Sequence, residues 1–294
     1  MVDENGNQSV ESVRLMYPQR GETIVCNQTS NAYTIGDQIG EGNFGVVYAC
    51  SDKWGNSLAV KVLKPKGTYY DVRKSCIKER DKLFLLRHPH ITYLHDVFEY
   101  RNAFYIITER CSSTLASMMK VKNFAGRVWL RPVAHCILQA VHFIHTQGYL
   151  HQDIHVGNVF STFIKDELLP ENNQALQFKI GDLGISRLID EITPESTMAN
   201  WMIPPEMLDP ERFGRPDHRV DIYHLGLLFL QMILGGDIRF KSEDIVNGRP
   251  EFIASQLNIP EGNVLAKTLT PMVNKRITSA LDLWCELDRV LPIN

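Results

Sequence analysis

The sequence lacks a marked excess of charge and a long apolar run. Its 294 residues carry 31 basic and 34 acidic side chains, a formal net charge of -3. This balance gives no electrostatic reason to expect binding to nucleic acid or to an anionic membrane. The most apolar stretch, residues 225–234, is far shorter than the roughly 20 residues that a membrane-spanning helix needs. We interpret it as a buried helix.

The chain also lacks a CxxC pair and a histidine cluster that could complete a zinc site, although it contains six cysteines. Scattered thiols in a chain of this size are typical of a reducing compartment. We therefore expect a cytoplasmic protein, and the sequence of a protein delivered into the cytosol of a host cell would look similar. Residues 1–14 are polar and acidic, so no secretory signal is visible.

Hydrophobic patterning separates the beginning of the chain into two parts. Residues 1–32 are polar with little periodicity and predict an N-terminal extension. Residues 33–109 contain five runs rich in β-branched and aromatic residues, separated by turns. A partly apolar helical segment at 72–88 ends before Pro89, because proline disfavours helical geometry in the residue before it. This part therefore predicts a five-stranded sheet with one helix.

After Glu109 the apolar residues take helical spacing, first at 129–149 and again from Asp221 onward. Short strands are expected between these helices, around 149–153, 158–160 and 178–182.

A glycine-rich loop joins the first two expected strands. Gly40, Gly42 and Gly45 follow a G-x-G-x-x-G-x-V pattern. Positions without side chains let backbone N–H groups approach phosphates closely. A strand follows the loop, whereas a dinucleotide site needs a helix there. Taken alone, the motif also fits a plain hairpin.

Lys61 lies in the next expected strand, where its ammonium can reach phosphate oxygens if a carboxylate holds it. Glu79 on the expected helix is the candidate, because it shares a face with Leu83 and Leu86.

The segment HQDIHVGN, residues 151–158, carries the expected reaction chemistry. Asp153 is placed to accept the proton of a substrate hydroxyl, and Asn158 to bind a metal ion and hold the loop. Asp182, in the segment IGDLG, is the second expected metal ligand. Magnesium prefers hard oxygen ligands, so one carboxylate and one amide beside a triphosphate suffice.

Together and in this order, these motifs resemble those of eukaryotic-type protein kinases, from Tyr33 nearly to the C-terminus. The resemblance implies an α+β, bilobal fold. A small lobe at 33–109 would hold a five-stranded antiparallel sheet, and a larger, mainly helical lobe would span 110–294. It also implies transfer of phosphate from ATP, with Mg2+, to a hydroxyl group of a protein substrate.

The resemblance assigns further residues to the site. It places Thr108 at the gatekeeper position and Glu109 to Cys111 in the hinge that meets adenine. The expected catalytic residues are Asp153, Lys61, Glu79 and His155, and the expected metal ligands are Asn158 and Asp182. The expected nucleotide-binding residues are Ile39, Gly40, Glu41, Gly42, Asn43, Phe44, Gly45, Val47, Ala59, Lys61, Thr108, Glu109, Cys111 and Phe160.

Outside the site, the resemblance implies two supporting contacts. Glu206, in the segment PPE, would pair with Arg276. Asp221, at the start of the helix DIYHLG, would brace the backbone of the catalytic loop, residues 151–158.

The chain departs from the family pattern at several positions. Gln152 replaces an arginine that usually grips a phosphate on the activation segment, which here lies between Asp182 and Glu206. His155 replaces a lysine and would supply a cation only when protonated. Leu183 replaces a phenylalanine of similar character. About ten extra residues within 161–177 are expected to extend a hairpin turn.

The activation segment contains three hydroxyl residues, Thr193, Ser196 and Thr197. Because glutamine carries no charge, Gln152 is a poor receiver for a phosphate on any of them. We expect activity without phosphorylation of this segment.

Trp201, five residues before Glu206, favours a serine/threonine kinase over a tyrosine kinase. Two alternatives remain from the sequence. The segment DIHVGN, residues 153–158, also resembles the loop of small-molecule kinases that act on aminoglycosides or choline, but these lack the PPE-like segment and the Asp221 helix start. The other alternative is a pseudokinase scaffold, which would need a missing essential group.

Overall fold

The computed structural model describes residues 17–42, 45–64, 67–165, 174–196, 198–199 and 201–292. They form two compact units, each considered by itself. The first contains the described residues up to Phe84 together with Tyr93–Arg110, and the second contains Leu85–Thr92 and the described residues from Cys111 onward. The segment Leu85–Thr92 was expected in the first lobe and groups instead with the second unit.

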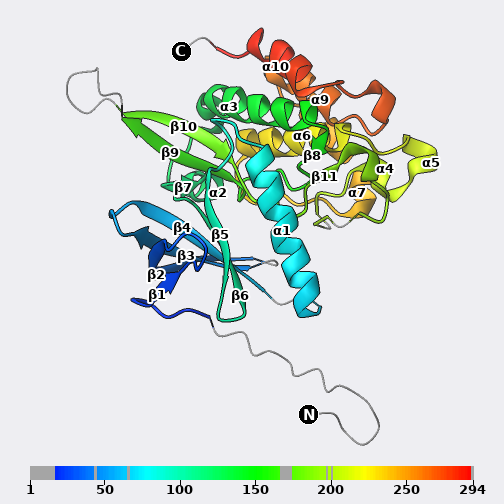
Figure 1. Cartoon of the computed structure of the whole chain (residues 1–294). Coiled ribbons are helices and arrows are strands. Elements are labelled where there is room, and N and C mark those ends of the chain that lie inside the picture. The colour runs from blue at the N-terminus through cyan, green and yellow to red at the C-terminus, as the bar shows by residue number, and fades with distance from the viewer. Residues whose placement is uncertain are drawn as a thin grey trace, which may run out of the picture. The chain divides into compact units, whose positions relative to one another are not determined.

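The first unit is an antiparallel sheet with one helix (Figure 1). The strand order is β1-β2-β3-β4-β6-β5. The elements are β1 (Thr23–Val25), β2 (Ala32–Glu41), β3 (Gly45–Asp52), β4 (Ser57–Leu63), α1 (Tyr69–Leu85), β5 (Leu94–Tyr100) and β6 (Ala103–Glu109).

The prediction of five strands was wrong by one, because β1 lies within the residues expected to form an extension. It pairs with β2, and Ile24 lies opposite Tyr33. Ile24 and Cys26 are almost completely buried in the core of the sheet. A short strand of this kind is defined by its pairing partner and by burial, which a local pattern of three residues does not reveal.

The two faces of the sheet carry different side chains, because successive residues of a strand point to opposite faces. Val46, Val60 and Ile107 contribute to the core cluster on one face. On the other face, Val47 lies opposite Lys61, and Ala59 lies opposite Thr108. The expected nucleotide-binding residues of β3, β4 and β6 therefore share one face of the sheet.

Helix α1 begins at Tyr69, three residues before the predicted start. Thr68 and Asp71 explain the difference. The Thr68 amide donates to the Asp71 carboxylate over 2.8 Å, and the Asp71 amide donates back to the Thr68 hydroxyl over 3.3 Å. This reciprocal arrangement satisfies N–H groups that the first helical turn leaves without partners.

The second unit is mainly helical. Its helices are α2 (Leu115–Met119), α3 (Gly126–Thr146), α4 (Pro205–Leu208), α5 (Pro210–Phe213), α6 (Arg219–Leu234), α7 (Ser242–Val246), α8 (Arg249–Ser255), α9 (Pro260–Thr268) and α10 (Ala280–Asp288), with 3-10 turns at Ile189–Glu191 and Val273–Lys275. Its strands are β7 (Ser113–Thr114), β8 (Tyr149–Leu150), β9 (Val159–Lys165), β10 (Gln174–Ile180) and β11 (Arg187–Leu188).

Helix α6 lies at the centre of this unit and packs on α3 and α9 (Figure 1). Every residue from Val220 to Met232 is buried, which confirms that the most apolar stretch of the sequence forms a core helix. Among the helices that the structure describes, none is both long and apolar enough to cross a bilayer.

The inserted residues extend a hairpin, as predicted. Strand β9 continues to Lys165 and β10 begins at Gln174, and the two pair along their whole length. The tip of the insertion, residues 166–173, lies outside the described residues.

Candidate active site

Lys61 and Glu79 form the ion pair expected from the sequence. Lys61 lies on β4, and its Nζ atom is 2.9 Å from Oε1 of Glu79 on α1. The side chains retain only 15% and 8% of their exposure. A pair shielded from water to this degree holds the ammonium in one place more firmly than a surface pair does.

The three glycines of the glycine-rich loop have different structural settings. The Gly42 amide donates to the carbonyl of Gly45 over 2.9 Å. A Cβ atom at Gly42 would meet no atom within 4 Å, but one at Gly45 would lie 2.6 Å from the carbonyl oxygen of Val62. Gly45 is therefore required by the packing of β3 on β4. Asn43 and Phe44, both expected to bind nucleotide, lie outside the described residues.

Substitution by alanine is therefore expected to have different effects at Gly45 and at Gly42. Gly45→Ala is expected to destabilise the first unit by about 1–3 kcal/mol, because the strands must move apart. Gly42→Ala is expected to leave the melting temperature unchanged and to raise the KM for ATP about tenfold, because a methyl group blocks the approach of a phosphate. Thermal melting and steady-state kinetics of both variants test this. Equal melting temperatures would contradict the assignment of Gly45.

The remaining nucleotide-binding candidates fall in both units. Ile39 is exposed on β2, and the Glu41 carboxylate at the end of β2 pairs with Lys64, the residue after β4, over 2.6 Å. The Glu109 carboxylate accepts the Tyr93 amide over 2.7 Å. Cys111 and Phe160 belong to the second unit. The contact of these residues with adenine stays a prediction.

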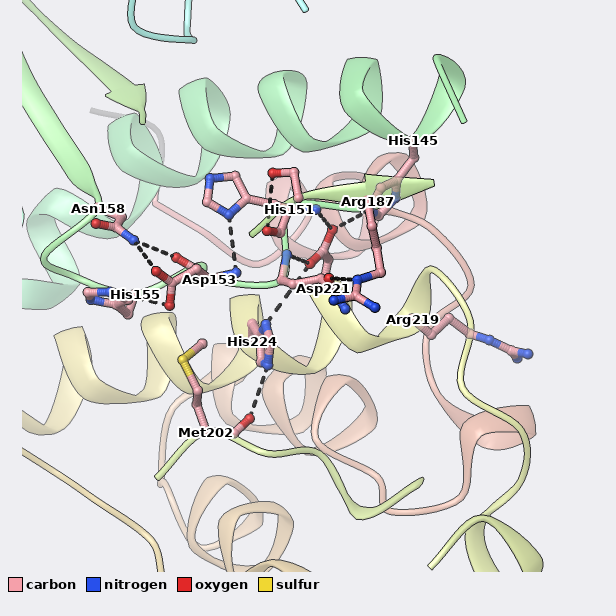
Figure 2. Close-up of polar contacts among 12 residues, drawn as sticks. His145, His151, Asp153, His155, Asn158, Arg187, Met202, Arg219, Asp221 and His224 are labelled. Atoms are coloured by element: carbon pink, nitrogen blue, oxygen red, sulfur yellow. Dashed lines mark hydrogen bonds and ion pairs between the residues drawn. The ribbon is translucent and has the colours of Figure 1, made fainter. Parts of the chain in front are cut away.

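Asp221 braces the catalytic loop, as predicted. Its two carboxylate oxygens accept the backbone amides of His151 and Gln152, each over 2.8 Å. The ring of His145 lies 2.9 Å from the same carboxylate. Figure 2 shows Asp221 with His145 and His224 beside it. Gln152 has a left-handed backbone, with φ of 67°, and such strain persists only where surrounding contacts hold it.

Asp221 is completely buried and still ionised. Burial alone would raise the pKa of Asp221, but the hydrogen bond and the charge of His145 outweigh it and lower the pKa to about 2. A buried carboxylate that accepts several hydrogen bonds keeps its charge in this way.

Two histidine rings of the catalytic loop each accept the backbone amide that lies two residues further along the chain. Nδ1 of His151 accepts the amide of Asp153 over 3.2 Å, and Nδ1 of His155 accepts the amide of Gly157 over 3.0 Å. A nitrogen that accepts carries no proton, so the proton of each neutral ring lies on Nε2. Nε2 of His155 is 3.6 Å from the Asp153 carboxylate.

Asp153 is held by its neighbours in the loop. The Asn158 side-chain amide donates to Oδ2 of Asp153 over 2.8 Å and to its backbone carbonyl over 3.0 Å (Figure 2). Burial would raise the pKa of Asp153, but the interactions with His155, His151 and Asn158 outweigh it and lower the pKa. Asp153 is therefore ionised at neutral pH and can accept a proton.

The expected metal ligands have suitable chemistry and neighbouring backbone positions. Both donor hydrogen bonds of the Asn158 amide go to Asp153, so its side-chain oxygen is the atom that could bind a cation. The Gly181 amide donates to the Asn158 carbonyl over 3.0 Å, which fixes the residue before Asp182 next to the loop. One amide oxygen and one carboxylate form a hard donor set that fits a divalent cation such as Mg2+.

A polar contact that the sequence did not predict joins the loop to the activation segment. The guanidinium of Arg187 donates to the side-chain oxygen of Gln152 and to the hydroxyl of Ser196, each over 2.7 Å. The amide of Thr193 donates to the same hydroxyl over 3.0 Å. Thr197, the third hydroxyl residue of the segment, lies outside the described residues.

His224 makes a second contact that sequence reasoning missed. Burial lowers its pKa to about 4, so the ring is neutral at pH 7, and Nε2 lies 3.0 Å from the carbonyl of Met202 (Figure 2). This contact ties α6 to the end of the activation segment. The neighbouring Trp201 packs edge-on against the ring of His155, with centroids 5.5 Å apart.

The predicted pair of Glu206 and Arg276 is also present. The guanidinium donates to both carboxylate oxygens over 2.6 and 2.8 Å, and both side chains are completely buried. The bidentate geometry secures the start of α4 to the segment before α10.

Comparison with known proteins supports the family resemblance described from the sequence. The family model described as "Protein kinase domain" matches residues 33–283. Serine/threonine-protein kinase PLK2 of Mus musculus is 26% identical over 223 residues, which cover 74% of this chain and 31% of that protein. Probable serine/threonine-protein kinase zyg-1 of Caenorhabditis briggsae is 29% identical over 199 residues, which cover 67% and 26%. Cyclin-dependent kinase-like 1 of Caenorhabditis elegans is 26% identical over 203 residues, which cover 67% and 54%. The chain thus matches between about a quarter and about half the length of these relatives.

Proposed function

The chain belongs to the protein kinase family, and from this premise we propose that it transfers the γ-phosphate of ATP to a serine or threonine hydroxyl of a protein. The observation that carries the proposal is the loop around Asp153. Its carboxylate is ionised and held by Asn158, and Asp221 holds the backbone of the two residues before it.

Each side chain has a defined part in the proposed reaction. Lys61, fixed by Glu79, neutralises phosphate oxygens of ATP. Asp153 orients the acceptor hydroxyl and accepts its proton as the oxygen attacks phosphorus. Asn158 and Asp182 would hold Mg2+, which when bound neutralises charge on the phosphates. His155 lies beside Asp153 and packs against Trp201.

The proposal of serine or threonine as acceptor rests on Trp201 and on the similar proteins named as serine/threonine kinases. The Asp221 brace and the buried pair of Glu206 and Arg276 argue against a kinase for aminoglycosides or choline, which lacks these elements. The presence of Lys61, Glu79, Asp153, Asn158 and Asp182 argues against a pseudokinase.

The test uses the purified full chain with ATP, Mg2+ and a peptide library, followed by mass spectrometry. Phosphate on serine or threonine is the expected result. Phosphate only on tyrosine would refute the acceptor class, and transfer only to choline or aminoglycosides would favour the small-molecule alternative. No transfer to any acceptor would favour a pseudokinase.

The metal assignment gives a separate prediction. Asp182→Asn is expected to weaken ATP binding in the presence of Mg2+ about tenfold or more, and to leave binding without Mg2+ unchanged, because a charged ligand becomes neutral. Isothermal titration with and without Mg2+ measures both. Asp81→Asn, at an exposed position of α1, is the control. If ATP binding depends on Mg2+ to the same extent in Asp182→Asn and in the unmodified chain, Asp182 is not a metal ligand.

We further propose that the protein works in a cytoplasm, its own or that of a host cell. Cys26, Cys50, Cys76, Cys136 and Cys285 are free thiols. Burial raises the pKa of Cys50 and Cys76 to about 12, so these two are unreactive.

A further inference from the structure

We infer that Gln152, Arg187 and Ser196 form a clasp that orders the activation segment without a phosphate group. We call it the Arg187 clasp. The three residues position other groups and do not touch the reacting atoms. The effect of the clasp on catalysis rests on the proposed kinase function, but its effect on the order of the segment does not.

The clasp spans three parts of the second unit. Arg187 lies on β11, which pairs with β8 just before the catalytic loop. From there its Nε atom reaches Gln152 in the loop, and its Nη1 atom reaches Ser196, nine residues further along the segment. Both distances are 2.7 Å, at the short end for N–H···O bonds and typical of a charged donor. One guanidinium therefore fixes the segment to the loop.

The environment of Gln152 favours a hydrogen-bond acceptor over a cation. The residue is completely buried, and its backbone is held by Asp221. Its side-chain oxygen meets Arg187, whereas its side-chain nitrogen has no hydrogen-bond partner within the described part of the chain. A buried donor without a partner is unfavourable. Only the oxygen of this amide therefore contributes a stabilising hydrogen bond. An arginine here would place two cations side by side.

The hydroxyl of Ser196 already has the partners that an ordering phosphate would need. Its oxygen accepts from Arg187 and from the amide of Thr193, and a hydroxyl oxygen has two lone pairs. The Ser196 amide in turn donates to the carbonyl of Thr193 over 2.9 Å. The turn at 193–196 is thus closed on itself and attached to Arg187 by neutral acceptors only.

The clasp is also connected to the part of the site where the acceptor peptide would bind. The segment it orders leads to Trp201, whose ring contacts His155, and His155 lies beside Asp153. A disordered segment would therefore disturb the approach of the acceptor peptide more than the binding of ATP.

The experiment measures hydrogen exchange of residues 187–196 in the full chain after phosphatase treatment, with loss of phosphate confirmed by mass spectrometry. Arg187→Gln and Ser196→Ala are each expected to raise the exchange rate about tenfold or more, since each removes a charge-assisted hydrogen bond. The effect of the double variant should be smaller than the product of the two single effects, because both changes break the same bond between Arg187 and Ser196. Arg289→Gln, at an exposed position of the same unit, should match the unmodified chain.

Changes at Gln152 test the choice of acceptor. Gln152→Glu is expected to keep the slow exchange, because its carboxylate still accepts from Arg187, and Gln152→Arg to lose it. In kinetic assays, Arg187→Gln should raise the KM for a peptide about tenfold and leave the KM for ATP within about twofold.

Two results would overturn the clasp: exchange in the dephosphorylated chain as fast as in Arg187→Gln, or exchange in Arg187→Gln and Ser196→Ala as slow as in the unmodified chain. A chain that shows the expected exchange pattern and yet phosphorylates no peptide would refute the proposed function and support the clasp.

Discussion

Asp153→Asn is expected to reduce phosphate transfer to a peptide at least about a hundredfold and to leave the affinity for ATP within about twofold. The amide has nearly the shape of the carboxylate, so its oxygen can still accept from Asn158. It cannot accept the proton of the acceptor hydroxyl. Single-turnover assays measure the transfer step, and titration with ATP measures the affinity.

Asp190→Asn is the matched control, because Asp190 is an exposed carboxylate of the same unit. It should transfer phosphate at the normal rate. Should Asp153→Asn retain more than half of the normal rate, Asp153 would not be the residue that handles the proton. A loss of ATP affinity equal to the loss of rate would instead indicate a damaged fold.

Asp221→Asn is expected to destabilise the protein by about 3 kcal/mol and to lower its melting temperature by roughly 6–12 °C. The substitution replaces one carboxylate oxygen by an NH2 group, which then faces a backbone N–H of His151 or Gln152. That buried donor loses its acceptor, and the charge that holds His145 disappears. Phosphate transfer should fall as well, because the backbone next to Asp153 is released.

Thermal melting over a range of pH distinguishes the loss of the Asp221 charge from a general destabilisation of the fold. The pKa of Asp221 is about 2 in the folded protein and 3.8 ordinarily, so the unfolded chain binds the proton more readily. The stabilisation is therefore complete above about pH 4 and is lost as the pH falls toward 2. The difference in melting temperature between Asp221→Asn and the unmodified chain should therefore become smaller as the pH falls from about 4 toward 2. Asp288→Asn, which breaks a surface pair with Arg131, should change stability by less than about 1 kcal/mol. An effect of Asp221→Asn no larger than this would show that the brace is unimportant.

The residues that could be predicted from the sequence lie in short motifs with fixed spacing. Lys61 and Glu79, and Asp153 with Asn158, follow from motifs that specify both the residue types and the elements that carry them. The buried pair of Glu206 and Arg276 was predicted through the family resemblance, although the two residues are 70 positions apart. For these residues the motif and the geometry agree.

The contacts that could not be predicted join residues whose local sequence has no distinguishing feature. His145 and Asp221 are 76 positions apart, and His224 reaches Met202 through a ring that looks like an ordinary residue of an apolar helix. The crowding at Gly45 could not be predicted either, because it arises from the carbonyl of Val62 on a neighbouring strand. Such features depend on the packed structure.

The position of Asp221 on α6 has a consequence for how the catalytic loop opens. Breaking the loop away locally would strip two hydrogen bonds from a charge enclosed by protein, in a helix buried from Val220 to Met232. The free energy of such an opening approaches that of unfolding the helix itself. The loop and α6 therefore belong to one cooperative unit, and Asp153 keeps its place for as long as the core of the second unit stays folded.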